Sequence, residues 1–485
     1  MLAISEQFKK EANLIGGEWV GSDSGETFDV NNPATGAIIG NVPNAGRGEA
    51  TRAIDAAAEA FKTFSKTTAK ERSEMLHKLH DLIMENLESL AHLLSAEQGK
   101  PLAEARGEIG MSAAYIRWYA AEARRVYGDV IPSPWADRRI LVNREPIGVV
   151  SCITPWNFPS SMLARKVGPA IAAGCTVVCK PAEATPYSGL AWGVLAEMAG
   201  IPPGVINILT GNPIKIGEEL TTNPKVRKVT FTGSTRVGKI ILEQCSRTVK
   251  KCSMELGGNA PFIVFDDADI DRAVEGAIAA KYRNSGQTCV CTNRFFAQSG
   301  IYDRFIEKLV AATSTLKVGE YVDEEVKQGP LINEAAVQKC EEFVADAVEK
   351  GGNVALGGAR HALGGNFFEP TVITNASADM KFSHDEIFGP VAPVYKFDTE
   401  DEVVEMANNT NFGLAAYFYT QDLGRTYRVM EALEYGLVGV NEGVITTVEA
   451  PFGGFKESGL GKEGGYQGIE DYVESKYVCV GGLGL

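Results

Sequence analysis

Two side chains able to do covalent chemistry stand out in this sequence. Cys289 follows residues 285–288, a short turn of polar residues and glycine. Glu255 ends the strand-like segment 252–255 and is followed by Gly257-Gly258. A thiolate is the reactive form of cysteine, and a carboxylate can activate water as a general base. The pair predicts a thioester cycle in which Cys289 attacks a carbonyl carbon and Glu255 activates the water that releases the product.

Taken one at a time, these residues have more common interpretations. A lone cysteine is more often a buried structural thiol, and most carboxylates take part in ordinary ion pairs. Asn157 could be a turn residue before Pro159, and residues 386–388 could form a turn before Pro390. The functional interpretation depends on their occurrence together.

The combined pattern resembles the aldehyde dehydrogenase superfamily. It consists of the Cys289 and Glu255 segments, Thr154-Pro155-Trp156-Asn157 and Glu386-Ile387-Phe388-Gly389-Pro390, and the likeness extends from about residue 14 to the C-terminus. The resemblance implies that the Asn157 amide and the Cys289 backbone N–H hold the oxyanion formed by attack on an aldehyde. It also implies that Glu255 activates the water that hydrolyses the thioester. Relatives that pass the acyl group to coenzyme A lack this acid, so Glu255 indicates a free-acid product.

Composition excludes several other classes of protein. The chain has 485 residues, 45% of them hydrophobic, and a formal net charge of −15, which disfavours a nucleic-acid partner. Nine scattered cysteines and five histidines without metal-ligand spacing indicate neither a disulfide framework nor a metal site. The longest apolar run, residues 167–179, is too short to cross a bilayer, and the N-terminus lacks a secretory or transit pattern. We therefore expect a cytoplasmic protein with no membrane partner.

Strand and helix patterns alternate along most of the chain. Amphipathic helices are predicted near 48–64, 71–93 and 102–126, after a hairpin region at 15–42. Strand-like runs at 148–153, 176–179, 205–209, 226–231 and 252–255 alternate with helical runs at 161–173, 187–199, 214–221 and 237–248. This alternation predicts an α/β fold with a parallel, doubly wound sheet, and a second alternation from about 259 to 440 predicts a second α/β unit.

The resemblance assigns these units to an aldehyde-dehydrogenase-like fold. A Rossmann-type dinucleotide-binding domain would comprise residues 1–128 and 148–257, and a catalytic domain would comprise residues 258–440. Residues 129–147 and 441–485 would supply a β-hairpin oligomerisation arm and a C-terminal strand. A homodimer or homotetramer is the implied assembly.

A glycine turn between a strand and a helix suits a dinucleotide. Residues 231–238 lack the Gly-x-Gly-x-x-Gly spacing. Residues 233–239 nearly match the phosphate loop of nucleoside triphosphatases, but the next position, 240, is Ile rather than Ser or Thr. By resemblance, Lys180 and Glu183 hold the adenosine ribose, and Glu183 would repel a 2′-phosphate, so NAD is expected over NADP. The residues that the resemblance assigns to the cofactor are Pro155, Trp156, Lys180, Ala182, Glu183, Gly233, Ser234, Leu256, Glu386 and Phe388.

Two arginines near the cysteine indicate an aldehyde with a distal carboxylate. Arg165 and Arg283 could bind such a group through charge-assisted hydrogen bonds, although a single arginine is usually a surface charge. Residues 161–166, 282–291 and 459–464 resemble succinate-semialdehyde dehydrogenases, in which equivalent arginines bind the substrate carboxylate. Thr446-Thr447 replaces the Ser-Ser or Ser-Asn of many such enzymes, so a hydroxyl remains at Thr446 but the pocket changes shape. Succinate semialdehyde is the expected substrate, with glutarate semialdehyde or broad specificity as alternatives.

Other functions remain open from sequence alone. Cys291 could form a reversible, inactivating disulfide with Cys289, which would be a redox switch, although an i, i+2 bond is geometrically strained. A Cys–His hydrolase could use His384, and a non-catalytic binding protein could share the fold. Dinucleotide-dependent turnover would separate the oxidoreductase from both of these.

Overall fold

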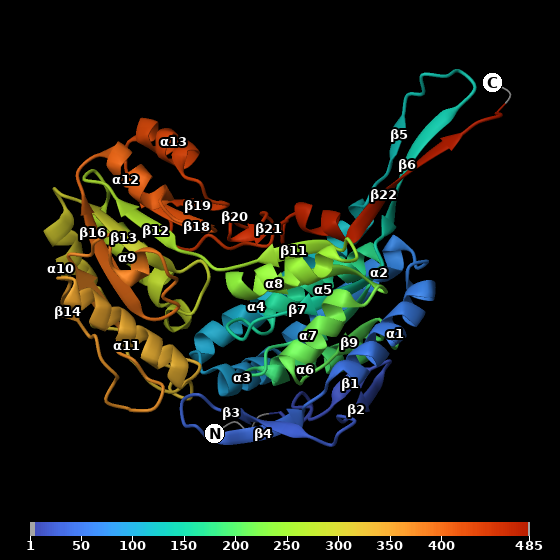
Figure 1. The fold of residues 1–485 in the computed structure, drawn as a ribbon, viewed down its shortest axis with the longest axis horizontal. Helices are drawn as coiled ribbons and strands as arrows, with labels where there is room; N and C mark the ends of the chain where they lie inside the picture. Colours follow the sequence, from blue (N-terminus) through green and yellow to red (C-terminus); the bar gives the residue numbers. More distant parts are fainter. Residues whose placement is uncertain (1–4, 484–485) are drawn as a thin grey trace.

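An eight-stranded sheet organises the first of two lobes (Figure 1). The computed structural model describes residues 5–483. In spatial order the strands are β2 (Glu18–Val20), β1 (Asn13–Ile15), β9 (Ile206–Ile208), β8 (Thr176–Lys180), β7 (Val149–Ile153), β10 (Val226–Thr232), β11 (Lys251–Glu255) and β21 (Gly459–Leu460). The five strands from β9 to β11 are parallel, whereas β1, β2 and β21 at the edges are antiparallel. The predicted parallel sheet is confirmed.

Helices cover both faces of this sheet, because alternate strand residues are apolar toward each face. Val150 and Cys152 pack against one helical layer, and Val149 packs against the other. The first layer contains α2 (Ala69–Glu85), α3 (Leu87–Gln98), α4 (Leu102–Glu122), α5 (Ser161–Ala173) and α6 (Pro186–Ala199). The second contains α1 (Arg47–Phe64), α7 (Pro213–Thr222) and α8 (Thr235–Ser246). Burial on both faces is the signature of a doubly wound sheet.

One helix prediction was wrong in detail. The expected helix at 71–93 is two helices, α2 and α3, divided at Asn86. The Asn86 side-chain amide donates to the Leu82 carbonyl at 2.8 Å, which caps the end of α2. Asparagine favours such local bonds over helix continuation, although the apolar periodicity runs on past it. The helix expected to reach 126 ends at Glu122 and continues as a 3₁₀ turn over Ala123–Arg125.

A seven-stranded sheet organises the second lobe. Its order is β14 (Asn353–Leu356), β15 (Thr371–Thr374), β16 (Val391–Phe397), β13 (Thr292–Gln298), β12 (Ala260–Val264), β18 (Ala415–Tyr419) and β19 (Leu437–Val440). All pairs are parallel except β14 with β15. One face is covered by α9 (Ile270–Tyr282) and α10 (Tyr302–Thr313), the other by α11 (Glu334–Glu349), α12 (Glu400–Asn408) and α13 (Leu423–Ala432). The second α/β unit is thus present as predicted.

A three-stranded arm extends away from both lobes (Figure 1). It pairs β5 (Asp129–Ile131) and β22 (Val473–Val480) with opposite edges of β6 (Arg139–Pro146), antiparallel in both cases. The hairpin predicted at 130–147 and the strand predicted at the C-terminal tail are confirmed. Val130 on the arm is 77% exposed, which is unusual for a β-branched apolar residue in a strand.

Four shorter strands complete the architecture. β3 (Thr27–Asn31) pairs with β4 (Ile38–Pro43), and β17 (Phe412–Gly413) pairs with β20 (Phe455–Lys456). The first pair lies in the predicted hairpin region at 15–42. Between residues 5 and 483, every helix is too short or too polar to cross a membrane.

Candidate active site

The strand order of the first lobe creates a crevice at one edge of its sheet. Chain order along β9-β8-β7-β10-β11 reverses between β7 and β10, so the loops that follow these two neighbours leave toward opposite faces. Ligands of open α/β sheets bind at such a switch point, beside the carboxyl ends of the strands. Residues 154–157 follow β7, and Gly233-Ser234 follows β10. Lys180 ends β8 and Glu255 ends β11, so four predicted site segments share this edge.

The turn between β10 and α8 leaves a helix N-terminus accessible. Gly233 donates its backbone N–H to the Glu255 carbonyl at 3.0 Å, and a Cβ at Gly233 would lie 2.4 Å from the Phe231 ring. Ser234 is the exposed N-cap of α8 and accepts from the Val237 N–H at 3.4 Å. The remaining free N–H groups and the helix dipole suit an anion such as a diphosphate.

Lys180 and Glu183 form an ion pair at the carboxyl end of β8. The Lys180 side chain is buried and also donates to the Pro181 carbonyl at 3.2 Å, whereas the Glu183 side chain is 42% exposed. Ala182 between them is nearly buried. A half-exposed carboxylate held by a buried lysine can accept hydrogen bonds from ribose hydroxyls.

The second lobe presents Cys289 on a strained loop. Asn284 and Ser285 have φ of 52° and 57°, and Gly286 follows at 76°, so three consecutive residues are left-handed. A Cβ at Gly286 would lie 2.2 Å from the Gly389 carbonyl oxygen. Consecutive left-handed residues are costly for side chains other than glycine, and they persist where surrounding contacts hold them. Cys289 itself is half-buried and is a free thiol.

Asn157 lies directly against the cysteine loop. Its side-chain Nδ2 donates to the Gln287 carbonyl at 3.0 Å, and its Oδ1 is buried without a hydrogen-bond partner in the described chain. Its own carbonyl accepts from Asn284 Nδ2 at 3.0 Å and from Lys100 Nζ at 2.8 Å. An amide nitrogen has two hydrogens, so one N–H of Asn157 remains for a bound oxygen atom.

Glu255 is buried, and neither carboxylate oxygen has a hydrogen-bond partner within residues 5–483. Burial raises the pKa of Glu255 well above its ordinary value, and the charge of Glu463 raises it further. This shift favours the protonated form of the carboxyl. An unpartnered buried carboxyl is rare, and it marks a group free to interact with a ligand or water.

Glu386 and Phe388 link the two lobes on the cofactor side of the crevice. Glu386 Oε1 accepts from the Gly258 N–H at 3.1 Å, and burial raises the pKa of Glu386 to about 7. The Phe388 ring meets Trp156 edge to face, with ring centres 5.5 Å apart. Pro155 and Trp156 are half-buried, and Leu256 is buried against Gly238 of α8. The structure therefore brings the predicted cofactor residues together along one edge.

The two arginines have different environments. Arg165, buried on α5, donates to Tyr115 Oη at 2.8 Å and lies 4.2 Å from the centre of the Phe452 ring, while its Nε has no partner in the part of the chain described. Arg283, half-buried at the start of the cysteine loop, lies 5.6 Å from the centre of the Phe158 ring and forms no ion pair with residues 5–483. Both guanidinium groups retain hydrogen-bonding capacity for an anion.

Thr446 and Cys291 differ in exposure. Thr446 is half-buried in the loop after β19. Cys291 is a buried free thiol whose Sγ donates to the Lys281 carbonyl at 3.4 Å, and burial raises its pKa. A disulfide with Cys289 would require Cys291 to leave this hydrogen bond. His384, the residue of the alternative hydrolase, is exposed on the surface.

Sequence reasoning missed a buried polar segment that supports the site. Gln98 Nε2 donates to Asn284 Oδ1 at 3.0 Å, and Lys100 pairs with Glu108 at 2.7 Å. Glu97 accepts the N–H groups of Tyr187 and Ser188 at the start of α6. No local sequence signal marks these residues, because the partners that bury them are distant in the chain.

Glu463 was also missed. It is buried, it pairs with Lys166, and it lies 3.6 Å from an Arg165 nitrogen. Its charge acts on both Glu255 and Tyr115. The carboxylate therefore belongs to the electrostatic surroundings of the site.

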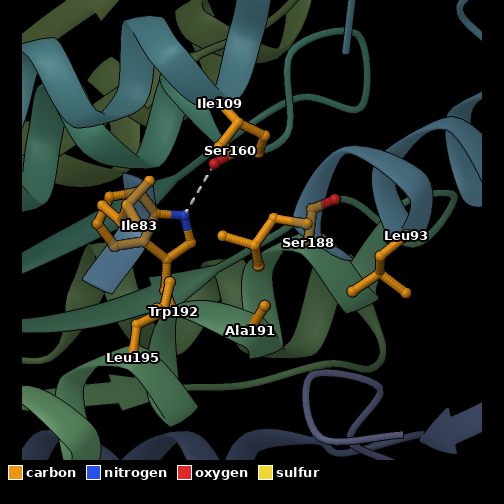
Figure 2. A pocket seen from close by; sticks show the side chains of 9 residues that line it. Ile83, Leu93, Ile109, Ser160, Ser188, Ala191, Trp192 and Leu195 are labelled. Atoms are coloured by element: carbon orange, nitrogen blue, oxygen red, sulfur yellow. Dashed lines mark hydrogen bonds between the residues drawn. The ribbon is translucent and has the colours of Figure 1, made fainter. Parts of the chain in front are cut away.

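An enclosed cavity behind the Asn157 loop is too small to be the substrate site (Figure 2). Its volume is about 10 Å³, and Trp192 donates its indole N–H to Ser160 Oγ at 3.3 Å across it. Ligand pockets are commonly some hundreds of Å³. This cavity therefore cannot hold a substrate of ordinary size. Across residues 5–483, no three His, Cys, Asp or Glu side chains are grouped to hold a metal ion.

The pH dependence of Cys289 reactivity follows from its burial. Burial raises the pKa of Cys289 to about 12, and the charge of Glu386 adds to this effect. The thiolate fraction, and with it the rate of alkylation, should rise about tenfold for each pH unit between 7 and 9 in the protein without ligands. The rate can be measured by iodoacetamide labelling, followed by mass spectrometry of the peptide that contains residue 289. A plateau near pH 7 would contradict this assignment.

Comparison with known proteins agrees with this geometry. The aldehyde dehydrogenase family model matches residues 19–478. The chain is 59% identical to a 3-sulfolactaldehyde dehydrogenase from Pseudomonas putida over 98% of both chains. It is 56% identical to a glutarate-semialdehyde dehydrogenase from Pseudomonas aeruginosa, which covers 99% of this chain and 100% of that one. It is 55% identical to an NADP(+) succinate-semialdehyde dehydrogenase from Escherichia coli, which covers 98% and 99%.

A solved structure shows the same architecture. The succinate-semialdehyde dehydrogenase of Burkholderia pseudomallei superposes with a TM-score of 0.98 at 56% identity, covering 99% of this chain and 100% of that chain. The predicted fold class and enzyme class are thereby confirmed. The protein is an NAD(P)-dependent enzyme that oxidises aldehydes, and the chain belongs to the aldehyde dehydrogenase family.

Proposed function

We propose that this enzyme oxidises succinate semialdehyde to succinate, with NAD as the preferred cofactor. The observations that carry the proposal are Arg165, which lies 3.6 Å from Glu463 but keeps a buried Nε without a partner within residues 5–483, and Arg283, which forms no ion pair within that range. The charge of Arg165 acts directly on the thiol, and Arg283 begins the loop that presents it. An aldehyde with a carboxylate at its far end can satisfy both guanidinium groups while its carbonyl meets the sulfur.

Glutarate semialdehyde is the second candidate. Thr446 adds a methyl group where a smaller residue is expected, and a relative at 56% identity is a glutarate-semialdehyde dehydrogenase. The three relatives described above are named for aldehydes that carry an acidic group, either a carboxylate or a sulfonate. The arginine pair suits this shared chemistry, whereas chain length depends on the shape of the pocket around Thr446.

The first chemical step is attack by sulfur. Cys289 must lose its proton, since the buried thiol is neutral at rest. The thiolate then forms a bond to the aldehyde carbon, and the carbonyl oxygen becomes an oxyanion. The free N–H of the Asn157 amide and the Cys289 backbone N–H would hold that oxygen. Such donors contribute about 3–4 kcal/mol each to lowering a barrier in a water-poor site.

The residues at the crevice fit a dinucleotide. A side chain at Gly233 would displace the Phe231 ring, and the open N-terminus of α8 can bind the diphosphate. Lys180 and Glu183 would hold the adenosine ribose, and Glu386 and Phe388 would hold the nicotinamide ribose, with Pro155, Trp156, Ala182, Ser234 and Leu256 lining the path between them. When bound there, the dinucleotide would supply the acceptor for the hydride lost by the carbon bonded to Cys289, and Cys289 would then hold the acyl group as a thioester.

Glu255 would complete the cycle as a general base. Burial and the charge of Glu463 raise its pKa, which favours the protonated form, and only the carboxylate form can accept a proton from water. Water then attacks the thioester carbonyl, the carbon–sulfur bond breaks, and the acid and the free thiol are released. A Cβ at Gly453 would lie 3.0 Å from Glu255 Oε1, so the glycine there leaves space beside the carboxyl for this water.

We also propose that the arm serves assembly, with dinucleotide binding in the first lobe (residues 1–128 and 148–257) and catalysis in the second (residues 258–440). The support is the exposure of Val130 and Ile131 on an edge strand that has no partner on its outer side in the described chain. A second copy of the chain, in a homodimer or homotetramer, would cover this edge. The predicted assembly segments are residues 129–147 and 441–485; within them β5, β6 and β22 form the arm, whereas β20 and β21 pair with strands outside it.

The substrate proposal is tested with Arg283→Leu. Loss of one charge-assisted interaction should raise KM for succinate semialdehyde about 10- to 100-fold, and KM for butyraldehyde should change less than twofold. Steady-state NADH formation with C3 to C6 semialdehydes, 3-sulfolactaldehyde and uncharged aldehydes measures both. Arg304→Leu, at an exposed arginine of the same lobe, is the matched control. Equal losses on charged and uncharged aldehydes would overturn the anion-binding role.

The cofactor preference is tested with Glu183→Ser. The wild-type enzyme should use NAD with higher kcat/KM than NADP, because a carboxylate repels the 2′-phosphate. The substitution should raise kcat/KM for NADP about tenfold or more. Wild-type kcat/KM for NADP that equals or exceeds the value for NAD would show that the assignment is wrong.

A further inference from the structure

We propose that Gln98 and Asn284 are positioning residues, which fix the oxyanion donor Asn157 relative to Cys289 across the boundary between the two lobes. The inference rests on the proposed role of Asn157 and extends it to residues that touch no substrate. The geometry that carries it is a continuous chain of buried hydrogen bonds, which runs from the corner between α3 and α4 to the cysteine loop.

The chain begins at a corner that the second lobe holds in place. Gly99 turns with φ of 92° after α3, and a Cβ there would lie 2.7 Å from Pro330 of the second lobe. Gly329 approaches the Gly99 carbonyl so closely that a Cβ on it would lie 2.2 Å away. The Ser285 hydroxyl donates to the Gly329 carbonyl at 2.9 Å. The corner and the cysteine loop are therefore held by the same short segment.

Gln98 connects this corner to the cysteine loop. Its Oε1 accepts from the Lys100 backbone N–H at 2.9 Å, and its Nε2 donates to Asn284 Oδ1 at 3.0 Å. The Gln98 side chain is fully buried. Because both ends of the carboxamide are bonded, its orientation is fixed, and so is that of the Asn284 carboxamide it meets.

Asn284 passes this constraint to the proposed oxyanion donor. Its Nδ2 donates to the Asn157 carbonyl at 3.0 Å and to the Gln287 carbonyl at 3.1 Å. The Asn157 side chain donates to that same Gln287 carbonyl at 3.0 Å. Asn284 thus fixes both the backbone of Asn157 and the acceptor that orients its side chain. The left-handed conformation of Asn284 places its amide between the two lobes.

A second clamp acts on the Asn157 loop from the opposite side. Lys100 Nζ donates to the Asn157 carbonyl at 2.8 Å and to Glu108 at 2.7 Å. The other oxygen of Glu108 accepts the backbone N–H groups of Ser160 and Ser161 at 2.9 and 3.1 Å. A buried charge pair that loses one partner is strongly destabilising, so Lys100 and Glu108 are unsuitable for a clean test. Gln98 is neutral and can be replaced by an apolar residue of similar size.

The test is a double-mutant cycle between Gln98→Met and Asn157→Ala. If Gln98 acts through Asn157, Gln98→Met should lower kcat about tenfold in the wild-type background, because small misplacements of a catalytic group are costly. In the Asn157→Ala background it should lower kcat less than twofold. The KM for NAD should stay within twofold of wild type. Gln298→Met is the matched control, since Gln298 is a half-buried glutamine that donates to the Asp398 carbonyl at 2.9 Å, at the end of β13 opposite to the cysteine loop.

Asn284→Gly combined with Asn157→Ala provides a second, independent double-mutant cycle. Glycine tolerates the φ of 52° at this position, so the substitution removes the carboxamide without adding backbone strain. It should show the same loss of kcat in the wild-type background and the same lack of effect in Asn157→Ala. The cycle with Asn284→Gly tests the positioning role if the Gln98→Met enzyme does not fold.

The possible outcomes separate this inference from the proposed mechanism. Equal losses of kcat in both backgrounds, or unchanged kcat in the Gln98→Met and Asn284→Gly enzymes, would overturn the positioning role alone. An Asn157→Ala enzyme with wild-type kcat would instead overturn the oxyanion assignment on which the inference rests. Non-additive losses confined to Gln98 and Asn284, with Gln298→Met unchanged, would support it.

Discussion

Burial of ionisable side chains at the crevice between the lobes is the constraint on which the site depends. Burial raises the pKa values of Cys289, Glu255 and Glu386 above their ordinary values. The shift favours the neutral form of each side chain in the protein without ligands. A neutral thiol and a neutral carboxyl react slowly with water and oxidants. Reactivity must then be produced by what binds beside them, because a bound ligand changes the local charge and the exclusion of water.

The two lobes meet at the chain crossing that lies beside these buried groups. The chain passes from β11 to β12 through residues 256–259, directly after Glu255. A Cβ at Gly258 would lie 2.3 Å from the Cys289 carbonyl oxygen, so only a residue without a side chain lets the loop carrying the thiol approach this crossing. The same Gly258 donates to Glu386. One glycine therefore brings groups from both sheets to a single small volume, where each modifies the charge felt by the others.

Much of this architecture could be predicted from local sequence. The helix expected at 161–173 is α5 to the residue, and the five parallel strands lie within two residues of the predicted runs. Apolar alternation and turn residues carry this information, and they are local. The break at Asn86 was missed because an amide cap on Leu82 ends the helix within an unbroken apolar pattern. A side-chain cap of this kind gives only a weak signal in the sequence, although it determines where the helix ends.

The site was predictable where chemistry is concentrated in short motifs, and hidden where it depends on distant contacts. Cys289, Glu255 and Asn157 stand in recognisable segments, and the structure places them at one crevice. Gln98 meets Asn284, which lies 186 residues further along the chain, and Lys100 meets Asn157 at a separation of 57. Polar residues at the end of a helix appear solvated in sequence, since nothing local shows that another lobe covers them. Burial created by a tertiary contact turned these residues into supports for the site.

The substrate carbonyl carbon should form a covalent bond with the Cys289 sulfur, and Glu255 should be needed for hydrolysis of the resulting thioester. Glu255→Gln enzyme mixed with NAD and succinate semialdehyde, quenched by acid within milliseconds and digested, tests this directly by mass spectrometry. The account predicts one NADH per active site and a succinyl group on the peptide containing Cys289, which persists after NADH formation stops. Continued NADH formation with an unmodified Cys289 peptide would contradict it.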